Sequence, residues 1–167
     1  WDTLGLSAFR VNVNISPLQF HHRNLADSIA DFLVKSGLSP DRLELELTES
    51  AIMKNAETNI AKLGALKSLG VYLAVDEFGI GYSSLRYLKR FPIDTIKIDR
   101  RLVGDMNTSD GAAIVDATLA LAKALNLRVI AEGVEVESQV AHLASKGCDL
   151  LQGFYFARSI RPEDVPN

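Results

Sequence analysis

Six short apolar runs along the chain each end in a polar residue of a type that binds metal ions or phosphate groups. Between these runs the apolar residues recur at helical spacing, which predicts parallel strands joined by helices. The carboxyl ends of such strands meet at one edge of a sheet, so their terminal side chains would share a single site. The polar end-points are Asn14, Glu46, Asp76, Lys97 with Asp99, Glu132 and Gln152.

Most of these end-points are carboxylates, and a crowded set of carboxylates needs a counter-charge. Two like charges about 4 Å apart repel by roughly 4 kcal/mol at an effective dielectric constant near 20. Lys97 is the only cation among the end-points, so a divalent metal is the expected partner. Carboxylate oxygens with the amide oxygen of Asn14, and without cysteine or histidine, favour Mg²⁺ or Mn²⁺ over Zn²⁺.

Two acidic segments carry the most specific patterns. Asp76 and Glu77 follow an almost wholly apolar run and lead into a glycine-containing loop. Paired carboxylates of this kind suit two metal ions and in-line displacement at a phosphoryl group. Glu46 and Glu49 lie where another strand gives way to a loop, and there the pattern is equally typical of a helix capping box.

The other strand ends leave alternatives open. Lys97 and Asp99 are two residues apart in a strand, so their side chains share a face. They form either a structural ion pair or, among metal-bound carboxylates, a pair that orients water or steadies a phosphate oxygen. The glycines that follow Glu132 and Gln152 indicate either the close approach of a ligand or a tight turn.

The apolar pattern predicts strands at 9–15, 43–47, 71–75, 93–98, 129–131 and 150–156, and helices near 25–33, 60–69, 85–88, 114–125 and 136–144. Because all the strand ends carry site-like groups, a closed barrel is favoured over an open doubly wound sheet. A β/α barrel has eight strands and about 250 residues. This α/β chain of 167 residues therefore looks about two strands short.

The composition is that of an ordinary globular domain, with 47% apolar and 23% charged residues. The net charge of −3 supplies no basic field for a nucleic-acid backbone, so a long DNA or RNA partner is not expected. No run approaches the ~20 apolar residues of a membrane span, and the single cysteine, Cys148, fits a reducing compartment. We therefore expect a cytoplasmic domain without membrane contact, within a parent protein that could itself be membrane-anchored.

In this order and at this spacing, the polar segments resemble the EAL domain family. The matching segments are 13–16 with Gln19, 46–49, 76–85, 97–99, 131–135 and 152–153. The resemblance implies a modified TIM-like (β/α) barrel that hydrolyses the bacterial second messenger cyclic di-GMP to linear pGpG with Mg²⁺ or Mn²⁺. It further implies a homodimer, with a GGDEF or sensory domain elsewhere in the parent chain. Residues 1–167 would be the C-terminal three-quarters of the domain, with the two N-terminal strands and their Glu-Ala-Leu signature absent.

The same resemblance assigns a role to each matching position, with two metal ions expected in an active parent protein. The implied metal ligands are Asn14, Glu46, Asp76, Glu77 and Glu132. The implied catalytic residues are Lys97 and Asp99, which would hold or orient the attacking water, and Glu132. Gln19, Glu135 and Gln152 would line the substrate pocket, and Glu49 would anchor the glycine-containing loop.

Two positions depart from the family pattern. Glu77 stands where the family has a second aspartate, which extends the side chain by one methylene, and Ile80 stands where it has threonine. Domains of this family with altered motifs often bind cyclic di-GMP without cleaving it. The sequence favours a phosphodiesterase for the parent protein, with a non-catalytic receptor or dimerisation module as the alternative. The chain by itself is expected to be inactive, because one implied metal ligand lies in the missing strands.

Overall fold

The computed structural model describes residues 9–80 and 85–161, which form a single parallel sheet with helices between its strands. The six strands lie side by side in sequence order, and every neighbouring pair is parallel. They are β1 (Val11–Ile15), β2 (Leu43–Thr48), β3 (Tyr72–Phe78), β4 (Thr95–Ile98), β5 (Arg128–Glu132) and β6 (Leu150–Gln152).

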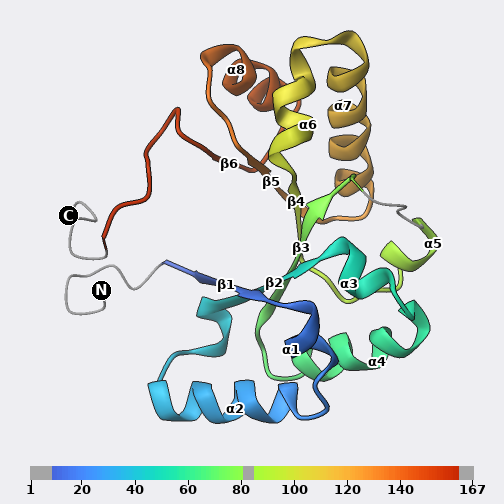
Figure 1. Ribbon diagram of the computed structural model, residues 1–167, viewed down its shortest axis with the longest axis vertical. Helices are drawn as coiled ribbons and strands as arrows, with labels where there is room; N and C mark the ends of the chain where they lie inside the picture. Colours follow the sequence, from blue (N-terminus) through green and yellow to red (C-terminus); the bar gives the residue numbers. More distant parts are fainter. Residues whose placement is uncertain (1–8, 81–84, 162–167) are drawn as a thin grey trace.

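The helices pack on the outer side of the curled sheet. In Figure 1, α6, α7 and α8 lie above the strands, α1, α2 and α4 lie below them, and α3 and α5 lie to their right. Their bounds are α1 (Pro17–His21), α2 (Leu25–Ser36), α3 (Glu49–Met53), α4 (Ala56–Lys67), α5 (Leu85–Leu88), α6 (Arg100–Gly104), α7 (Ser109–Ala124) and α8 (Glu137–Ser145), with short 3-10 turns η2 (Pro40–Arg42) and η3 (Asp105–Asn107). In the part of the chain that is described, no helix combines the length and apolarity needed to cross a membrane.

The strands show why this sheet holds a polar site. In β2 the alternate residues Leu43, Leu45 and Leu47 belong to the buried apolar core under the helices. The residues between them are Glu44 and Glu46, which are also buried but face the concave side of the sheet. The pattern of apolar outward and charged inward residues therefore fixes both the core and the site.

The predicted strands and helices are found, with boundary differences that have physical causes. The last strand ends at Gln152 and not at Phe156, because Val134 and residues 152–155 exchange backbone hydrogen bonds that turn the chain. The five-residue helices α1, α3 and α6 were not predicted. Residues 81–84 of the predicted glycine-containing loop lie outside the described residues.

A buried asparagine fixes the connection that follows β2. Asn59 in α4 donates from Nδ2 to the carbonyl oxygens of Ala51, Ile52 and Lys54, at 3.3, 3.0 and 2.7 Å. This side chain holds α3 against α4, and α3 begins with the site residue Glu49.

We therefore expect Asn59→Ala to lower the free energy of unfolding by about 1–3 kcal/mol, because buried carbonyl groups lose their donor. Denaturant unfolding monitored by circular dichroism measures the change. Asn24→Ala is the matched control, since Asn24 is exposed and its side chain makes no capping hydrogen bond. Equal midpoints for the two variants would show that Asn59 does not hold the helices together.

Candidate active site

Lys97 reaches from β4 into the concave side of the sheet, where its ammonium group meets three carboxylates. Lys97 Nζ lies 2.6 Å from Glu46 Oε2, 2.7 Å from Glu132 Oε1 and 3.7 Å from Asp76 Oδ1. These carboxylates come from β2, β5 and β3, so the strands on both sides of β4 contribute. Glu46 and Lys97 are each only 4% exposed. The structure thus brings together four of the residues that the sequence singled out.

The contacts in this cluster shift the pKa values of Lys97 and Glu132. Burial alone would lower the pKa of Lys97, but hydrogen bonds to Glu132 and Glu46 outweigh it and raise the pKa above its usual range. Burial raises the pKa of Glu132, and the charges of Asp76 and Glu46 act in the same direction against the hydrogen bond from Lys97. A protonated lysine among three carboxylates leaves the cluster with an excess of negative charge, which attracts cations.

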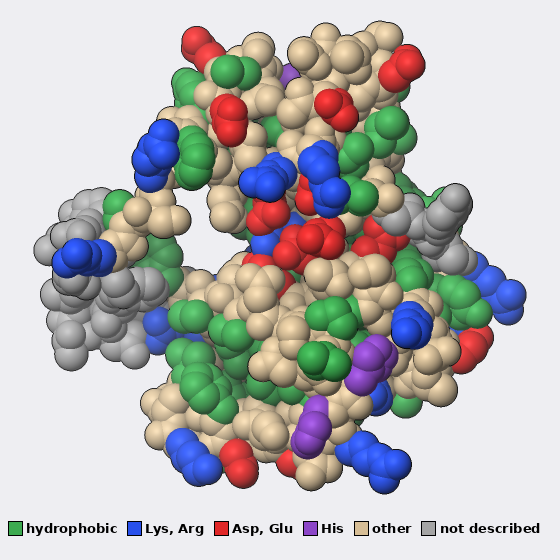
Figure 2. All heavy atoms as spheres, viewed as in Figure 1, with side chains coloured by type: hydrophobic (Ala, Val, Ile, Leu, Met, Phe, Trp, Pro, Cys, Tyr) green, Lys and Arg blue, Asp and Glu red, His purple; other side chains and the backbone are tan. Residues whose placement is uncertain are grey.

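Figure 2 shows this excess on the molecular surface. Acidic side chains gather in the centre of the face, over the strands that Figure 1 shows there, with basic side chains beside them. Across residues 9–80 and 85–161, no three histidine, cysteine, aspartate or glutamate side chains are spaced to hold a metal ion by themselves. The lysine ammonium occupies the point where the carboxylates converge.

Asp99 lies two residues after Lys97, just past the end of β4, and its carboxylate is engaged elsewhere. Its Oδ1 accepts hydrogen bonds from the backbone N of Arg101 at 2.7 Å and from Arg101 Nε at 2.8 Å, so it caps helix α6. Burial would raise the pKa of Asp99, but the contacts with Arg101 lower it below its usual range. The structure therefore presents Asp99 as an ionised acceptor that is paired with Arg101 and not with Lys97.

Asp76 and Glu77 lie on a β-bulge. Val75 pairs with Ile96 and Phe78 with Ile98, so β3 carries one residue more than β4 between these pairs. Glu77 has a φ of 55°, which is uncommon for a residue other than glycine, and its N–H donates to Asp76 Oδ1 at 2.8 Å. Glu77 is exposed and is absent from the carboxylates that contact Lys97.

Glu49 ties the end of β2 to the loop after β3. Its carboxylate is buried, and Oε2 accepts a hydrogen bond from the backbone N of Gly79 at 3.1 Å. Gly79 has a φ of 94°, and a Cβ there would lie 2.6 Å from Leu102 Cδ1. This hydrogen bond between Glu49 and Gly79 is the contact expected of a loop anchor. The alternative was a capping box, but the Thr48 side chain accepts no capping hydrogen bond at the start of α3.

A small cavity opens beside Glu132. It has a volume of about 230 Å³ and is lined by Glu132, Glu135, Gln152, Arg100 and Phe154 together with two glycines. The structure thus brings Glu135 and Gln152 to one hollow next to the carboxylate cluster. Their convergence suits the binding of a polar ligand that reaches Glu132.

The two glycines of this hollow are required by the protein itself. A Cβ on Gly133 would lie 2.4 Å from Arg100 Cβ, and one on Gly153 would lie 2.1 Å from the carbonyl oxygen of Val134. Close packing against other segments of the chain, which is neither of the two alternatives that the sequence left open, therefore accounts for both positions.

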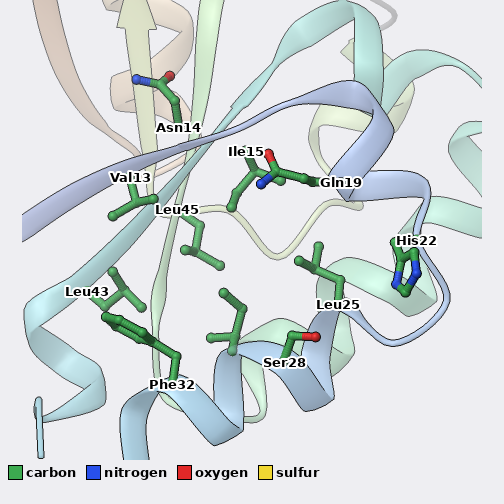
Figure 3. A pocket seen from close by; sticks show the side chains of 11 residues that line it. Val13, Asn14, Ile15, Gln19, His22, Leu25, Ser28, Phe32, Leu43 and Leu45 are labelled. Atoms are coloured by element: carbon green, nitrogen blue, oxygen red, sulfur yellow. The ribbon is translucent and has the colours of Figure 1, made fainter. Parts of the chain in front are cut away.

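Strand β1 separates a polar side from an apolar one. Asn14 pairs with Glu46 across β1 and β2, and in Figure 3 its side chain projects away from Val13 and Ile15. On the other side of β1 lies an apolar cavity of about 350 Å³ against α2. Gln19 lines this cavity, and its Oε1 accepts a hydrogen bond from the backbone N of Ser16 at 2.9 Å, which caps α1.

Comparison with known proteins decides what family this site belongs to. The sequence pattern of the EAL domain matches residues 1–159. The chain belongs to the EAL domain family. Its relatives of this family include the bifunctional diguanylate cyclase/cyclic di-GMP phosphodiesterase MucR of Pseudomonas aeruginosa, which is 43% identical over 166 residues. That alignment covers 99% of this chain and 24% of MucR, so the chain spans about a quarter of this relative.

Solved structures place this EAL domain among TIM-like barrels. The PaMucR phosphodiesterase in complex with c-di-GMP superposes with a TM-score of 0.96 at 43% identity, over 99% of this chain and 68% of that one. A manganese/cyclic di-GMP complex of BlrP1 from Klebsiella pneumoniae gives a TM-score of 0.84 at 36% identity, over 94% of this chain and 41% of that one. The six strands therefore form a curled half of a TIM-like barrel, which confirms the predicted fold class.

Two residues at the site of this EAL domain were not predicted. Asn12 donates from Nδ2 to Glu46 Oε1 at 2.9 Å, and Arg101 pairs with Asp99. Asn12 carries a detectable signal, because it shares a strand face with Asn14 two residues later. Arg101 could have been found from Asp99 as the N-cap of a helix, since such a cap bonds to the residues just inside the helix.

Proposed function

We propose that the protein carrying this EAL domain hydrolyses cyclic di-GMP to linear pGpG with the help of a divalent metal ion. The observation that carries the proposal is the convergence of Glu46, Asp76 and Glu132 on one buried cation at the carboxyl ends of the strands. MucR is named a cyclic di-GMP phosphodiesterase, and BlrP1 has a structure with manganese and cyclic di-GMP. These relatives supply the substrate class that the geometry alone leaves open.

The donor atoms fit Mg²⁺ or Mn²⁺. All the groups that converge on Lys97 are carboxylate oxygens, and the point where they meet already stabilises a positive charge. Asn14, Glu46, Asp76 and Glu132 would hold one ion, and Glu77 with Glu132 would serve a second. A bound ion would neutralise charge that develops on the phosphoryl group and make water more acidic.

The chain's own residues would position the reactants. Lys97 keeps its proton and can donate to a phosphate oxygen, because its raised pKa leaves it charged. Asp99 stays ionised and can accept a hydrogen bond from a water molecule, provided that Arg101 yields part of its contact. Glu135 and Gln152 would bind the nucleotide in the hollow beside Glu132. Gln19 lines the separate apolar cavity at β1, so it would contact the nucleotide only after leaving its hydrogen bond with the backbone N of Ser16.

The competing function is that of a cyclic di-GMP receptor without turnover, and the geometry at Glu77 favours it. Glu77 is exposed, adopts a left-handed backbone conformation and carries a charge that interacts with Arg101. Each feature draws this carboxylate away from Lys97 and its partners. A second metal would then be held less well than the first.

The two functions separate in one experiment. The full-length protein is incubated with cyclic di-GMP and Mn²⁺, and the nucleotides are resolved by chromatography while binding is measured in parallel. We expect pGpG to accumulate at a rate proportional to protein concentration. Binding without product would support the receptor, and the absence of both binding and product would exclude the two functions together.

Glu77→Asp tests the effect of the longer side chain. We expect the rate of pGpG formation to rise several-fold, because aspartate tolerates the left-handed conformation better than glutamate and places its carboxylate nearer the backbone. Glu137→Asp, at an exposed position in the first turn of α8, is the control and should leave the rate unchanged. An unchanged or lower rate for Glu77→Asp would sink this explanation.

The remaining features of the whole protein are also proposals. We propose that the six strands correspond to the last six of an eight-stranded barrel, since the chain covers 68% of the PaMucR structure. A homodimer is proposed. A GGDEF or sensory domain in the parent protein is also proposed, in line with the naming of MucR as a bifunctional protein. A cytoplasmic location is proposed, because the single cysteine, Cys148, fits a reducing compartment.

A further inference from the structure

Asn12 makes a contact to the carboxylate cluster that no motif predicts. It is the second residue of β1, and its Nδ2 donates to Glu46 Oε1 at 2.9 Å. In the register of the two strands Asn12 pairs with Glu44 and Asn14 with Glu46, so the hydrogen bond runs diagonally between β1 and β2. Diagonal neighbours on one face of a sheet lie within reach of a long side chain.

With this contact, each oxygen of the Glu46 carboxylate accepts a hydrogen bond. Oε1 accepts from Asn12 on the neighbouring strand β1, and Oε2 accepts at 2.6 Å from Lys97 on β4, which lies two strands away on the other side of β2. The terminal torsion of a glutamate is broad, so a single hydrogen bond does not fix the plane of its carboxylate. Two donors on the two oxygens do fix it. Glu46 is buried, whereas Asn12 is exposed on β1, so the hydrogen bond between them is partly buried.

We propose that Asn12 is a positioning residue that sets the plane of the Glu46 carboxylate for a divalent cation. The inference rests on the proposed function, in which Glu46 is a metal ligand. A carboxamide suits this task because it donates a hydrogen bond without adding charge. Lysine or arginine at this position would compete with the metal, and aspartate would add a further negative charge to an acidic cluster. Hydrogen bonds that orient metal ligands typically change metal affinity or activity by about 10–100-fold when they are removed.

The test measures Mn²⁺ binding to the full-length protein by titration calorimetry without nucleotide, together with the melting temperature in chelator. Asn12→Leu keeps the approximate size of the side chain and removes the donor. We expect its Mn²⁺ affinity to fall by about 10-fold or more, while the melting temperature in chelator stays close to that of the unsubstituted protein. Asn12→Gln retains the donor on a longer side chain and should recover part of the affinity. Asn24→Leu, at an exposed asparagine, should leave the affinity unchanged.

A second substitution separates failure of this inference from failure of the proposed function. Glu46→Gln should weaken Mn²⁺ binding strongly if Glu46 is a ligand. If Glu46→Gln weakens binding and Asn12→Leu does not, the metal site stands and the role of Asn12 is refuted. If neither substitution changes Mn²⁺ affinity, Glu46 is not a ligand and both proposals fall. A loss of melting temperature in chelator that accounts for the whole effect, with no recovery by Asn12→Gln, would make Asn12 a structural residue only.

Discussion

Lys97→Met is expected to destabilise the metal-free protein by about 3–5 kcal/mol, because Glu46, Asp76 and Glu132 then lose the cation with which all three pair. Glu46 is almost fully buried, and Glu132 and Asp76 converge with it on the lysine. Without the ammonium group these side chains repel one another across a medium of low polarity. Mn²⁺ should restore part of the lost stability, since it supplies the missing positive charge.

The same substitution should lower the rate of cyclic di-GMP hydrolysis by about 10²–10³-fold, because a preorganised donor to the phosphoryl group is removed. Thermal unfolding in chelator and in Mn²⁺, with a parallel assay of pGpG, measures both effects. Lys89→Met is the control, at an exposed lysine where a change within about 0.5 kcal/mol is expected. A Lys97→Met protein as stable as the control variant in chelator would show that the cluster is not held together by charge.

Asp76→Asn is expected to weaken Mn²⁺ binding strongly while leaving the fold intact. The carboxylates repel one another when no metal is bound, so the loss of one charge should leave the metal-free protein as stable as before or slightly more stable. Asparagine retains an oxygen that can accept the N–H of Glu77, which contacts Asp76 Oδ1 at 2.8 Å, so the bulge should persist. The effect should therefore appear in metal affinity and turnover, and not in the melting temperature in chelator.

Calorimetric titration with Mn²⁺ and thermal unfolding in chelator distinguish these outcomes. Asp31→Asn, an exposed aspartate in α2, should change neither quantity. A marked fall in melting temperature for Asp76→Asn with unchanged Mn²⁺ affinity would assign Asp76 a structural role instead.

Much of the site could be predicted from the sequence, because its polar residues coincide with the ends of predicted strands. Glu46, Asp76, Lys97 and Glu132 could be predicted to meet, since parallel strands in sequence order bring their carboxyl ends to one edge. The helix predicted near 25–33 is found as α2, which ends at Ser36 before Gly37 in the left-handed conformation that favours glycine.

The parts that escaped prediction depend on contacts between distant segments. The bond from Asn12 to Glu46 joins residues 34 positions apart, and its geometry follows from a strand register that the sequence does not reveal. The bulge at Glu77 depends on how β3 pairs with β4, and the early end of β6 depends on backbone bonds to Val134. The pairing of Asp99 with Arg101 is local, but it competes with the role in orienting the attacking water that the family resemblance implies.

The dependence of pGpG formation on free Mn²⁺ tests the central claim most directly. The full-length protein and its Glu46→Gln variant are assayed at saturating cyclic di-GMP, from chelator alone to excess metal. The carboxylate cluster around Lys97 predicts no product in chelator, a saturable rise in rate with Mn²⁺, and a requirement for much more metal in the variant. Product formation at the full rate in chelator, or the same metal dependence for both proteins, would contradict it.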